Sequence, residues 1–528
     1  MDKVTIFDST LRDGAQAEGI SFSVEDKLKI VKALDAFGVE YIEAGNPGSN
    51  PKDLEFFRRA GQLDLQNAKL VAFGSTRRYG IDVTEDKNVQ SLLDAGTEAI
   101  AIFGKSWDFH VTDILHTTLE ENLNMIADTV AFFKSKGKTL IFDAEHFFDG
   151  YRHNPDYAMQ ALQAAADAGA DWLVLCDTNG GAMPAEIADI TQKVCGAFSV
   201  PVGIHCHNDC GMAEANTVMS IEAGGRMVQG TFTGFGERCG NAALSTVIPV
   251  LQTKRGYDCI PMENLALLTR TARLVADVAN LSVSERAPFV GRTAFAHKGG
   301  MHIDGVSKAP HSFEHIDPES VGNERRMLTS EVAGRSTILR KIQRVRPDIQ
   351  KGSPETAQII DALKDLEHQG YQFEAAESTF ELVIRKKLGK YQPFFELVNF
   401  KIIGEQPYEK GRSANAVIKV LVDGKEEITA AEGDGPVNAL DKALRKALEV
   451  FYPQLASVHL TDYKVRVLDG GEATAAKVRV LIESSDGEQS WSNVGVSNDI
   501  IEASWIALVD SIEYKLIKDL EKKYSAYL

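Results

Sequence analysis

The chain has 528 residues, of which 44% are hydrophobic and 25% are charged, so it has the composition of a globular protein and a length that suits two or three domains. Its formal net charge of −18 argues against a nucleic-acid or anionic-membrane partner, because such contacts need clustered Lys and Arg. The sequence has neither a signal-peptide pattern nor an apolar stretch long enough to span a bilayer, so we expect a cytoplasmic protein with no membrane partner.

The first 258 residues alternate short apolar runs with helical segments. The runs are Val4–Phe7, Tyr41–Ala44, Leu70–Phe73, Ala99–Phe103, Thr139–Phe142, Trp172–Cys176, Val202–Ile204 and Met227–Thr231. Helical spacing with end signals is clearest in Glu25–Phe37, Glu120–Ser135 and Pro155–Ala168, each closed by a glycine. This alternation predicts a parallel sheet, and eight units in about 250 residues predict a closed (β/α)8 TIM barrel over residues 1–258. A doubly wound open sheet is the alternative, but it does not need eight regular units.

The segment Asp8–Ile20 follows the first run, so we expect Arg12 and Asp13 on the loop that leaves the first strand. A guanidinium can bind a substrate carboxylate in a forked geometry, while an aspartate offers a hard oxygen ligand to a cation. The ordinary alternative is a solvated surface pair.

A second polar segment, Gly203–Gly211, follows the seventh run. Residues two apart on a strand project to the same side, so His205 and His207 should point together while Cys206 points away. Two imidazoles and a carboxylate would suit a divalent metal. The alternative is one packed and one exposed histidine.

A barrel would bring these segments together, because the loops after all its strands meet at one face. Asp13 can then converge with His205 and His207. Burying so many polar groups at strand ends would be costly unless they bind something. The other polar residues expected at this face are Glu43, Asn46, Asp143, Glu145, Asp177, Thr178 and Asn241.

A mostly helical connector is predicted over residues 259–394. Its helical segments are Met262–Leu281, Pro354–Gln369 and Glu374–Leu388. Between them, Phe295–Gly305 is dense in His, Gly and Asp. It is either a capped turn between helices or a segment that delivers His302 to the barrel mouth for proton transfer.

The last part, residues 395–528, is predicted to be an α+β domain with an internal duplication. The first half contains the strands Leu397–Ile403 and Asn415–Val422 and the helix Val437–Phe451, and the second contains Tyr463–Val467, Ala475–Ile482 and Ile500–Leu520. Two such units would make either a small-molecule sensor or a dimerisation platform.

Four motifs in this order resemble the metal-dependent acyl-CoA Claisen synthases, which include the 2-isopropylmalate, homocitrate and citramalate synthases. They are Thr10–Gln16, His205–Asp209, Glu237–Asn241 and Phe295–Gly305, and the resemblance covers nearly the whole chain. Within the group, Gly48–Phe56, Phe142–Asp156 and Trp172–Gly181 look most like the longer citramalate synthases. The commoner TLRDGEQ motif has Ala15 here in place of its glutamate.

The resemblance implies a condensation of acetyl-CoA with pyruvate in isoleucine biosynthesis. By the family's pattern, the metal is held by Asp13, His205 and His207, with Asn241 as a more distant ligand. Arg12 would meet the keto acid and Thr178 its carboxylate, while Glu145 and His302 would transfer protons. The resemblance also implies a homodimer or higher oligomer, with His302 reaching the neighbouring subunit's barrel, and isoleucine as a feedback inhibitor.

The chemistry of the reaction agrees with these roles. A cation chelated by the keto acid would polarise its carbonyl, and Arg12 would stabilise the same developing charge. Mixed imidazole and oxygen ligands suit Mn, Co or Zn, and Mg less well. Three alternatives stay open: another 2-oxo acid as substrate, the reverse reaction of an acyl-CoA lyase or aldolase, and a ligand sensor on an inactive barrel.

Overall fold

The computed structural model describes residues 2–48, 50–328, 339, 342, 343, 345–350, 353–373, 376–404, 413–468, 476–487 and 489–525. The chain forms two compact units, Met1–Ala296 with Ala309–Arg326, and His297–Lys308 with Met327–Leu528. The predicted division at residues 258 and 394 stays a prediction. Among the described helices, none combines the length and the apolar character that a membrane crossing requires.

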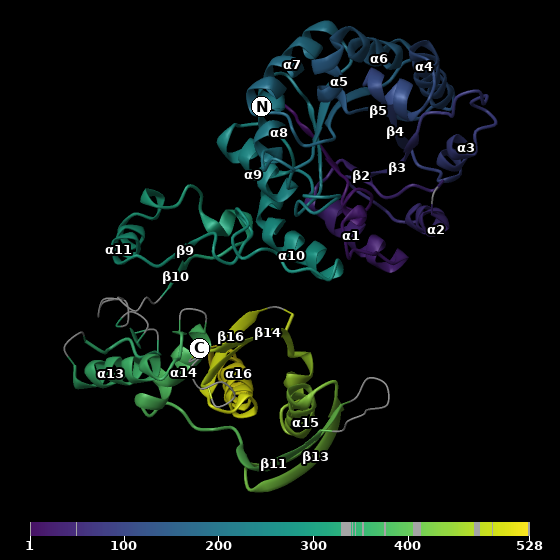
Figure 1. Ribbon diagram of the computed structural model, residues 1–528. Coiled ribbons are helices and arrows are strands. Elements are labelled where there is room, and N and C mark those ends of the chain that lie inside the picture. Colours follow the sequence, from purple (N-terminus) through teal and green to yellow (C-terminus); the bar gives the residue numbers. More distant parts are fainter. Residues whose placement is uncertain are drawn as a thin grey trace. The chain divides into compact units, whose positions relative to one another are not determined.

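The first unit contains the predicted TIM barrel, a closed parallel barrel of eight strands within the described chain, and not an open sheet (Figure 1). Alternate strand residues fill its interior, among them Phe7, Val71, Ile141 and Val174, while their neighbours pack outward against the helices. The strands are β1 (Thr5–Asp8), β2 (Tyr41–Glu43), β3 (Lys69–Ser75), β4 (Ala99–Lys105), β5 (Thr139–Glu145), β6 (Trp172–Asp177), β7 (Val202–Cys206) and β8 (Met227–Gly230).

Helices surround the barrel, and polar side chains fix where several of them begin. Ser23 and Asp26 form a reciprocal cap on the first helix, and Thr118 and Asn154 cap two others. The helices are α1 (Val24–Phe37), α2 (Pro51–Ala60), α3 (Lys87–Asp94), α4 (Leu119–Ser135), α5 (Phe147–His153), α6 (Pro155–Asp167), α7 (Pro184–Ala197), α8 (Ala213–Glu222), α9 (Leu244–Lys254) and α10 (Leu268–Val278).

The strand ends at the barrel mouth differ most from the prediction. The apolar runs suggested ends at Phe103 and Phe142, but β4 continues to Lys105 and β5 to Glu145, and these two residues face each other in the ladder. Hydrophobicity marks burial, whereas backbone pairing continues through polar residues. The ladder therefore extends into the polar layer that forms the mouth.

The helix predicted at the start of the connector is confirmed in position but differs in type and length, and one of the two alternatives for Phe295–Gly305 is excluded. The helix predicted over Met262–Leu281 is a 3₁₀-helix, Met262–Leu267, followed by the shorter α10. Phe295–Gly305 is not a turn between two helices, because it contains the short strand β9 (Ala296–His297) and the start of α11 (Gly300–Lys308). The strand β10 (Arg326–Met327) pairs with β9, and the later helices are α13 (Pro354–His368) and α14 (Glu377–Lys387), with Glu374 outside the described residues.

The duplicated domain repeats one arrangement, a three-stranded antiparallel sheet followed by a helix. Each sheet has a third strand that the apolar pattern does not predict, because these two strands are rich in polar residues. The first half has β11 (Glu396–Gly404), β12 (Ala414–Val422), β13 (Lys425–Gly433) and α15 (Pro436–Glu449). The second has β14 (His459–Val467), β15 (Val478–Ser485), β16 (Ser490–Ser497) and α16 (Ile500–Ser525); Ala475, predicted to begin a strand, lies outside the described residues.

Candidate metal centre at the barrel mouth

The loop after β1 is held in place by its own side chains. Asp8 accepts a hydrogen bond from the backbone N–H of Thr10 at 2.9 Å, and the Thr10 hydroxyl oxygen accepts one from the N–H of Phe232 at 2.8 Å. The N–H of Asp13 donates to the Ser9 hydroxyl at 3.2 Å. The contact with Phe232 joins the loops after the first and last strands, and the others fix the loop that places Asp13 at the barrel mouth.

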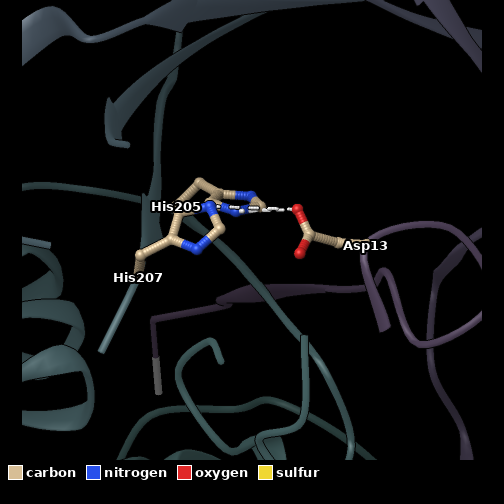
Figure 2. Close-up of side chains that lie close together, drawn as sticks. All are labelled: Asp13, His205 and His207. Atoms are coloured by element: carbon tan, nitrogen blue, oxygen red, sulfur yellow. Dashed lines mark ion pairs between the residues drawn. The ribbon is translucent and has the colours of Figure 1, made fainter. Parts of the chain in front are cut away.

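Asp13, His205 and His207 offer ligand atoms that all lie within 4.8 Å of one another (Figure 2). The Nε2 atoms of His205 and His207 lie 3.7 and 3.9 Å from Asp13 Oδ2. Because metal–nitrogen and metal–oxygen bonds are each about 2.1 Å long, two ligands of one ion can be about 4.2 Å apart. Both contacts fall within that limit, so the structure brings together the three residues that the sequence suggested as ligands.

The charges of these groups suit a cation. Asp13, His205 and His207 are at most 5% exposed. Burial, and then the neighbouring His205, lower the pKa of His207 to about 4, so its imidazole is neutral at pH 7. Burial alone would raise the pKa of Asp13, but Arg12 and the two imidazoles hold it well below its usual range. A carboxylate beside a neutral imidazole has the protonation state in which these groups bind metals.

Asn241 adds an amide oxygen to this set. Its Nδ2 donates to Asp13 Oδ1 at 2.8 Å, and its Oδ1 is buried without a hydrogen-bond partner among the described residues. A buried polar atom without a partner costs about 1–3 kcal/mol. A bound cation would remove that cost, so the donor set of carboxylate, imidazole and amide groups fits a divalent ion.

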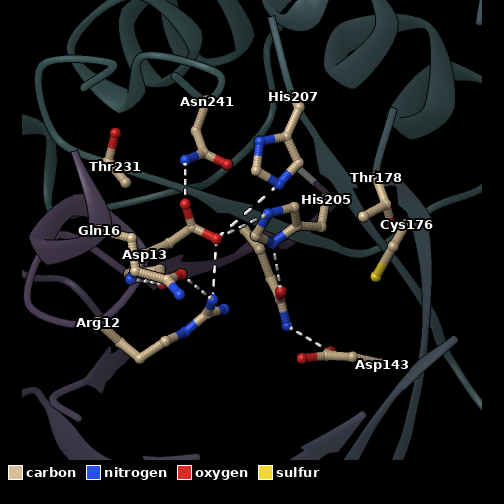
Figure 3. Close-up of polar contacts among 12 residues, drawn as sticks. Arg12, Asp13, Gln16, Asp143, Cys176, Thr178, His205, His207, Thr231 and Asn241 are labelled. Atoms are coloured by element: carbon tan, nitrogen blue, oxygen red, sulfur yellow. Dashed lines mark hydrogen bonds and ion pairs between the residues drawn. The ribbon is translucent and has the colours of Figure 1, made fainter. Parts of the chain in front are cut away.

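Arg12 is fixed on three sides, and Figure 3 shows its contact with Asp13. Its Nε donates to Glu43 Oε2 at 2.6 Å, its Nη1 donates to Asp13 Oδ2 at 2.8 Å, and its guanidinium carbon lies 3.9 Å from the centre of the Phe73 ring. A guanidinium held in this way keeps its orientation while charge develops beside it.

The other predicted residues fall in two places. Glu145 forms an ion pair with Lys105, and the Thr178 hydroxyl oxygen accepts a hydrogen bond from the N–H of His146 at 2.8 Å. Both lie at the carboxyl ends of barrel strands. His302 lies on an exposed part of α11 in the second unit, so its role stays a prediction.

Known proteins resemble each part of the chain. The HMGL-like family model matches residues 3–275, a homocitrate synthase post-HMGL domain-like model matches residues 289–371, and the LeuA allosteric (dimerisation) domain matches residues 374–516. An (R)-citramalate synthase from Aquifex aeolicus is 53% identical, and the match covers 99% of both chains. A second, from Synechocystis, is 53% identical over 97% of this chain and 96% of its own.

The chain belongs to the (R)-citramalate synthase family. It is therefore an enzyme, an acyltransferase, as the motifs indicated. A third family member, from Geobacter sulfurreducens, is 49% identical over 99% of both chains.

Lys105 and Gln229 also lie at the site of this chain, and the sequence motifs did not indicate either of them. Lys105 contacts Glu145, and Gln229 contacts His205, with 2.9 Å between Gln229 Oε1 and His205 Nδ1. Strand alternation contains the signal for both. Each occupies an inward-facing position two residues beyond an apolar one, Phe103 or Met227, where another apolar side chain would be the ordinary choice.

Proposed function

We propose that this chain condenses acetyl-CoA with pyruvate and hydrolyses the thioester, giving citramalate and CoA for isoleucine biosynthesis. One observation carries the proposal: the ligand atoms of Asp13, His205 and His207 lie within 4.8 Å of one another, with Arg12 bonded to Asp13. The (R)-citramalate synthase relatives support pyruvate as the keto acid.

Asp13, His205 and His207 would hold the divalent ion, with Asn241 as a further oxygen donor. Mn, Co and Zn match this donor set better than Mg does. When bound, the ion would polarise the keto carbonyl and offset negative charge on its oxygen.

Arg12 and Thr178 would bind the keto acid. Arg12 is already oriented by Glu43 and Asp13, so its remaining N–H groups can face the keto oxygen without reorganisation. The Thr178 oxygen already accepts a hydrogen bond from His146, so its O–H can donate to the substrate carboxylate.

Glu145 and His302 would transfer protons. A base removes a proton from the thioester methyl group, and the methyl carbon bonds to the keto carbon as the keto oxygen gains a proton. Water then cleaves the C–S bond, which leaves a carboxyl group and the CoA thiol. Glu145 suits the first step because Lys105 fixes its position at the mouth.

Thiol release with a panel of 2-oxo acids tests the proposal. We expect acetyl-CoA to yield free CoA with pyruvate and much less with 2-oxoisovalerate or 2-oxoglutarate. A chelator should abolish the reaction, and Mn²⁺ or Co²⁺ should restore it. A preference for a larger keto acid would reassign the substrate, and cleavage of a hydroxyacyl-CoA without synthesis would indicate a lyase.

We also propose that isoleucine inhibits the enzyme through residues 395–528 and that the chain dimerises through the same domain. The match to a LeuA allosteric (dimerisation) domain supports both. Isoleucine should slow turnover and raise the melting temperature, and light scattering should give a dimer. An unchanged rate and melting temperature with isoleucine would remove the inhibitor from the proposal.

His302 would act in the neighbouring subunit's barrel. Asp13→Asn and His302→Gln should each be inactive alone, because each removes one part of the machinery. Subunit exchange between them should restore activity if His302 acts across the dimer. If a confirmed mixed dimer regains no activity, His302 acts in the barrel of its own chain.

A further inference from the structure

Gln229 is a fully buried polar side chain inside the barrel. It lies on β8, two residues beyond Met227, which belongs to the apolar interior cluster. A buried amide among apolar side chains is costly unless both of its ends are bonded. The oxygen and the nitrogen of the Gln229 amide each form a hydrogen bond, one with His205 on β7 and the other with Asp143 on β5.

The two contacts form a continuous path from Asp143 to His205, which can be followed between these labelled residues in Figure 3. Gln229 Nε2 donates to Asp143 Oδ1 at 3.0 Å, and Gln229 Oε1 lies 2.9 Å from His205 Nδ1. Since Asp143 takes the amide N–H, the amide oxygen faces the imidazole. That oxygen can only accept, so the proton of His205 sits on Nδ1.

In the neutral imidazole, the form that binds metals, a proton on Nδ1 leaves the other ring nitrogen of His205 without one. That atom, Nε2, lies 3.7 Å from Asp13 Oδ2, on the side where the candidate ligands converge. A histidine must present an unprotonated nitrogen to a metal, and a hydrogen bond to its other nitrogen decides which one it is.

His207 differs in this respect. Its Nδ1 is buried without a hydrogen-bond partner among the described residues, so no contact fixes its tautomer. Among the described residues, a hydrogen bond at Nδ1 therefore orients the ring of His205 but not the ring of His207.

We propose that Gln229 and Asp143 are positioning residues that fix the tautomer and orientation of His205 for metal binding. The inference rests on the proposed function, because it takes His205 to be a metal ligand. Burial and the nearby Glu43 raise the pKa of Asp143 to about 8, but a neutral carboxyl group also accepts a hydrogen bond through its carbonyl oxygen.

A purely structural role for Gln229 predicts something different. If it only fills the interior, an apolar side chain of similar length should serve as well. If it positions His205, an acceptor of similar length is required. Gln229→Met and Gln229→Glu separate these cases, because only the second variant can accept from Nδ1.

The experiment measures Co²⁺ affinity of the full-length chain by competition with a chromogenic chelator. Gln229→Met should weaken binding about 10- to 100-fold, the usual effect of removing a hydrogen-bond partner of a ligand. Gln229→Glu should stay within a few-fold of wild type. Gln252→Met is the control, because Gln252 is also a buried glutamine, but it lies on α9 and donates to the Ile260 carbonyl.

A second measurement needs no variant at position 229. The ¹⁵N shifts of the His205 ring in the metal-free wild type, assigned with His205→Gln, should show a proton on Nδ1 and none on Nε2. A proton on Nε2 would overturn the inference, as would Gln229→Met binding Co²⁺ like wild type. Wild type that binds Co²⁺ without pyruvate-dependent turnover would contradict only the proposed function, and wild type that binds no Co²⁺ would contradict both.

Discussion

Asn241 donates from Nδ2 to Asp13 Oδ1 across 2.8 Å, joining two loops whose residues are 228 positions apart. With Oδ1 occupied in this way, the other carboxylate oxygen of Asp13 is the one that the two imidazoles face. The relationship explains how an aspartate from the start of the chain comes to serve a site built from its middle.

Asp13→Asn should lower kcat at least about 100-fold, because a metal's stabilisation of charge is worth several kcal/mol and each 1.36 kcal/mol is tenfold in rate. Turnover and melting temperature should be measured together. Asp35→Asn is the control, since Asp35 is also buried and accepts three backbone N–H bonds far from the site. The Asp35→Asn variant should have a lower melting temperature but normal turnover. Near-normal turnover by Asp13→Asn would reject the assignment of Asp13 as a metal ligand.

Arg12→Lys should reduce kcat by about 100-fold or more, because one ammonium cannot replace a planar fork that binds Glu43 and Asp13 together. The matched control is Arg77→Lys, which alters a buried arginine paired with Glu121 and Asp128. Steady-state kinetics should show a reduced kcat for Arg12→Lys and an unchanged kcat for Arg77→Lys. Equal losses in both variants would point to a general effect on the barrel.

Lys105→Met should lower kcat by at least about tenfold, because it removes the partner that positions Glu145 for proton transfer. Lys105→Arg keeps a cation there and should retain more activity. Lys134→Met, which removes an ion pair with Asp171 at a helix end, is the control and should leave kcat unchanged. Wild-type turnover in Lys105→Met would show that the ion pair has no part in catalysis.

Glu513→Gln should flatten the pH dependence of stability. Burial raises the pKa of Glu513 to about 7, so the folded chain holds this proton more tightly than the unfolded chain does. The wild type should therefore lose stability as pH rises from about 4.5 to about 7, by up to about 3 kcal/mol. Urea denaturation at pH 5 and pH 8 measures this difference. The exposed Glu502→Gln on the same helix should retain the wild-type slope, and an unchanged slope in Glu513→Gln would assign the effect to another group.

The sequence by itself determined the barrel, the duplicated domain and the family. Apolar alternation and helix ends are local properties, so they identified the strands and helices without knowledge of contacts. The motifs around Asp13 and His205 identified the candidate ligands, because strand alternation directs His205 and His207 to one side and barrel topology gathers strand ends at one face.

Only the tertiary structure decided which side chains touch. The contacts of Arg12 with Glu43, Lys105 with Glu145 and Gln229 with His205 join different strands, so they depend on strand order and register. Alternation within one strand shows which side chains face inward, but the residues that lie opposite them on other strands depend on how the strands are staggered around the closed barrel. For the same reason the strands that continue through polar residues, such as β13 and the end of β5, became visible only from their backbone pairing.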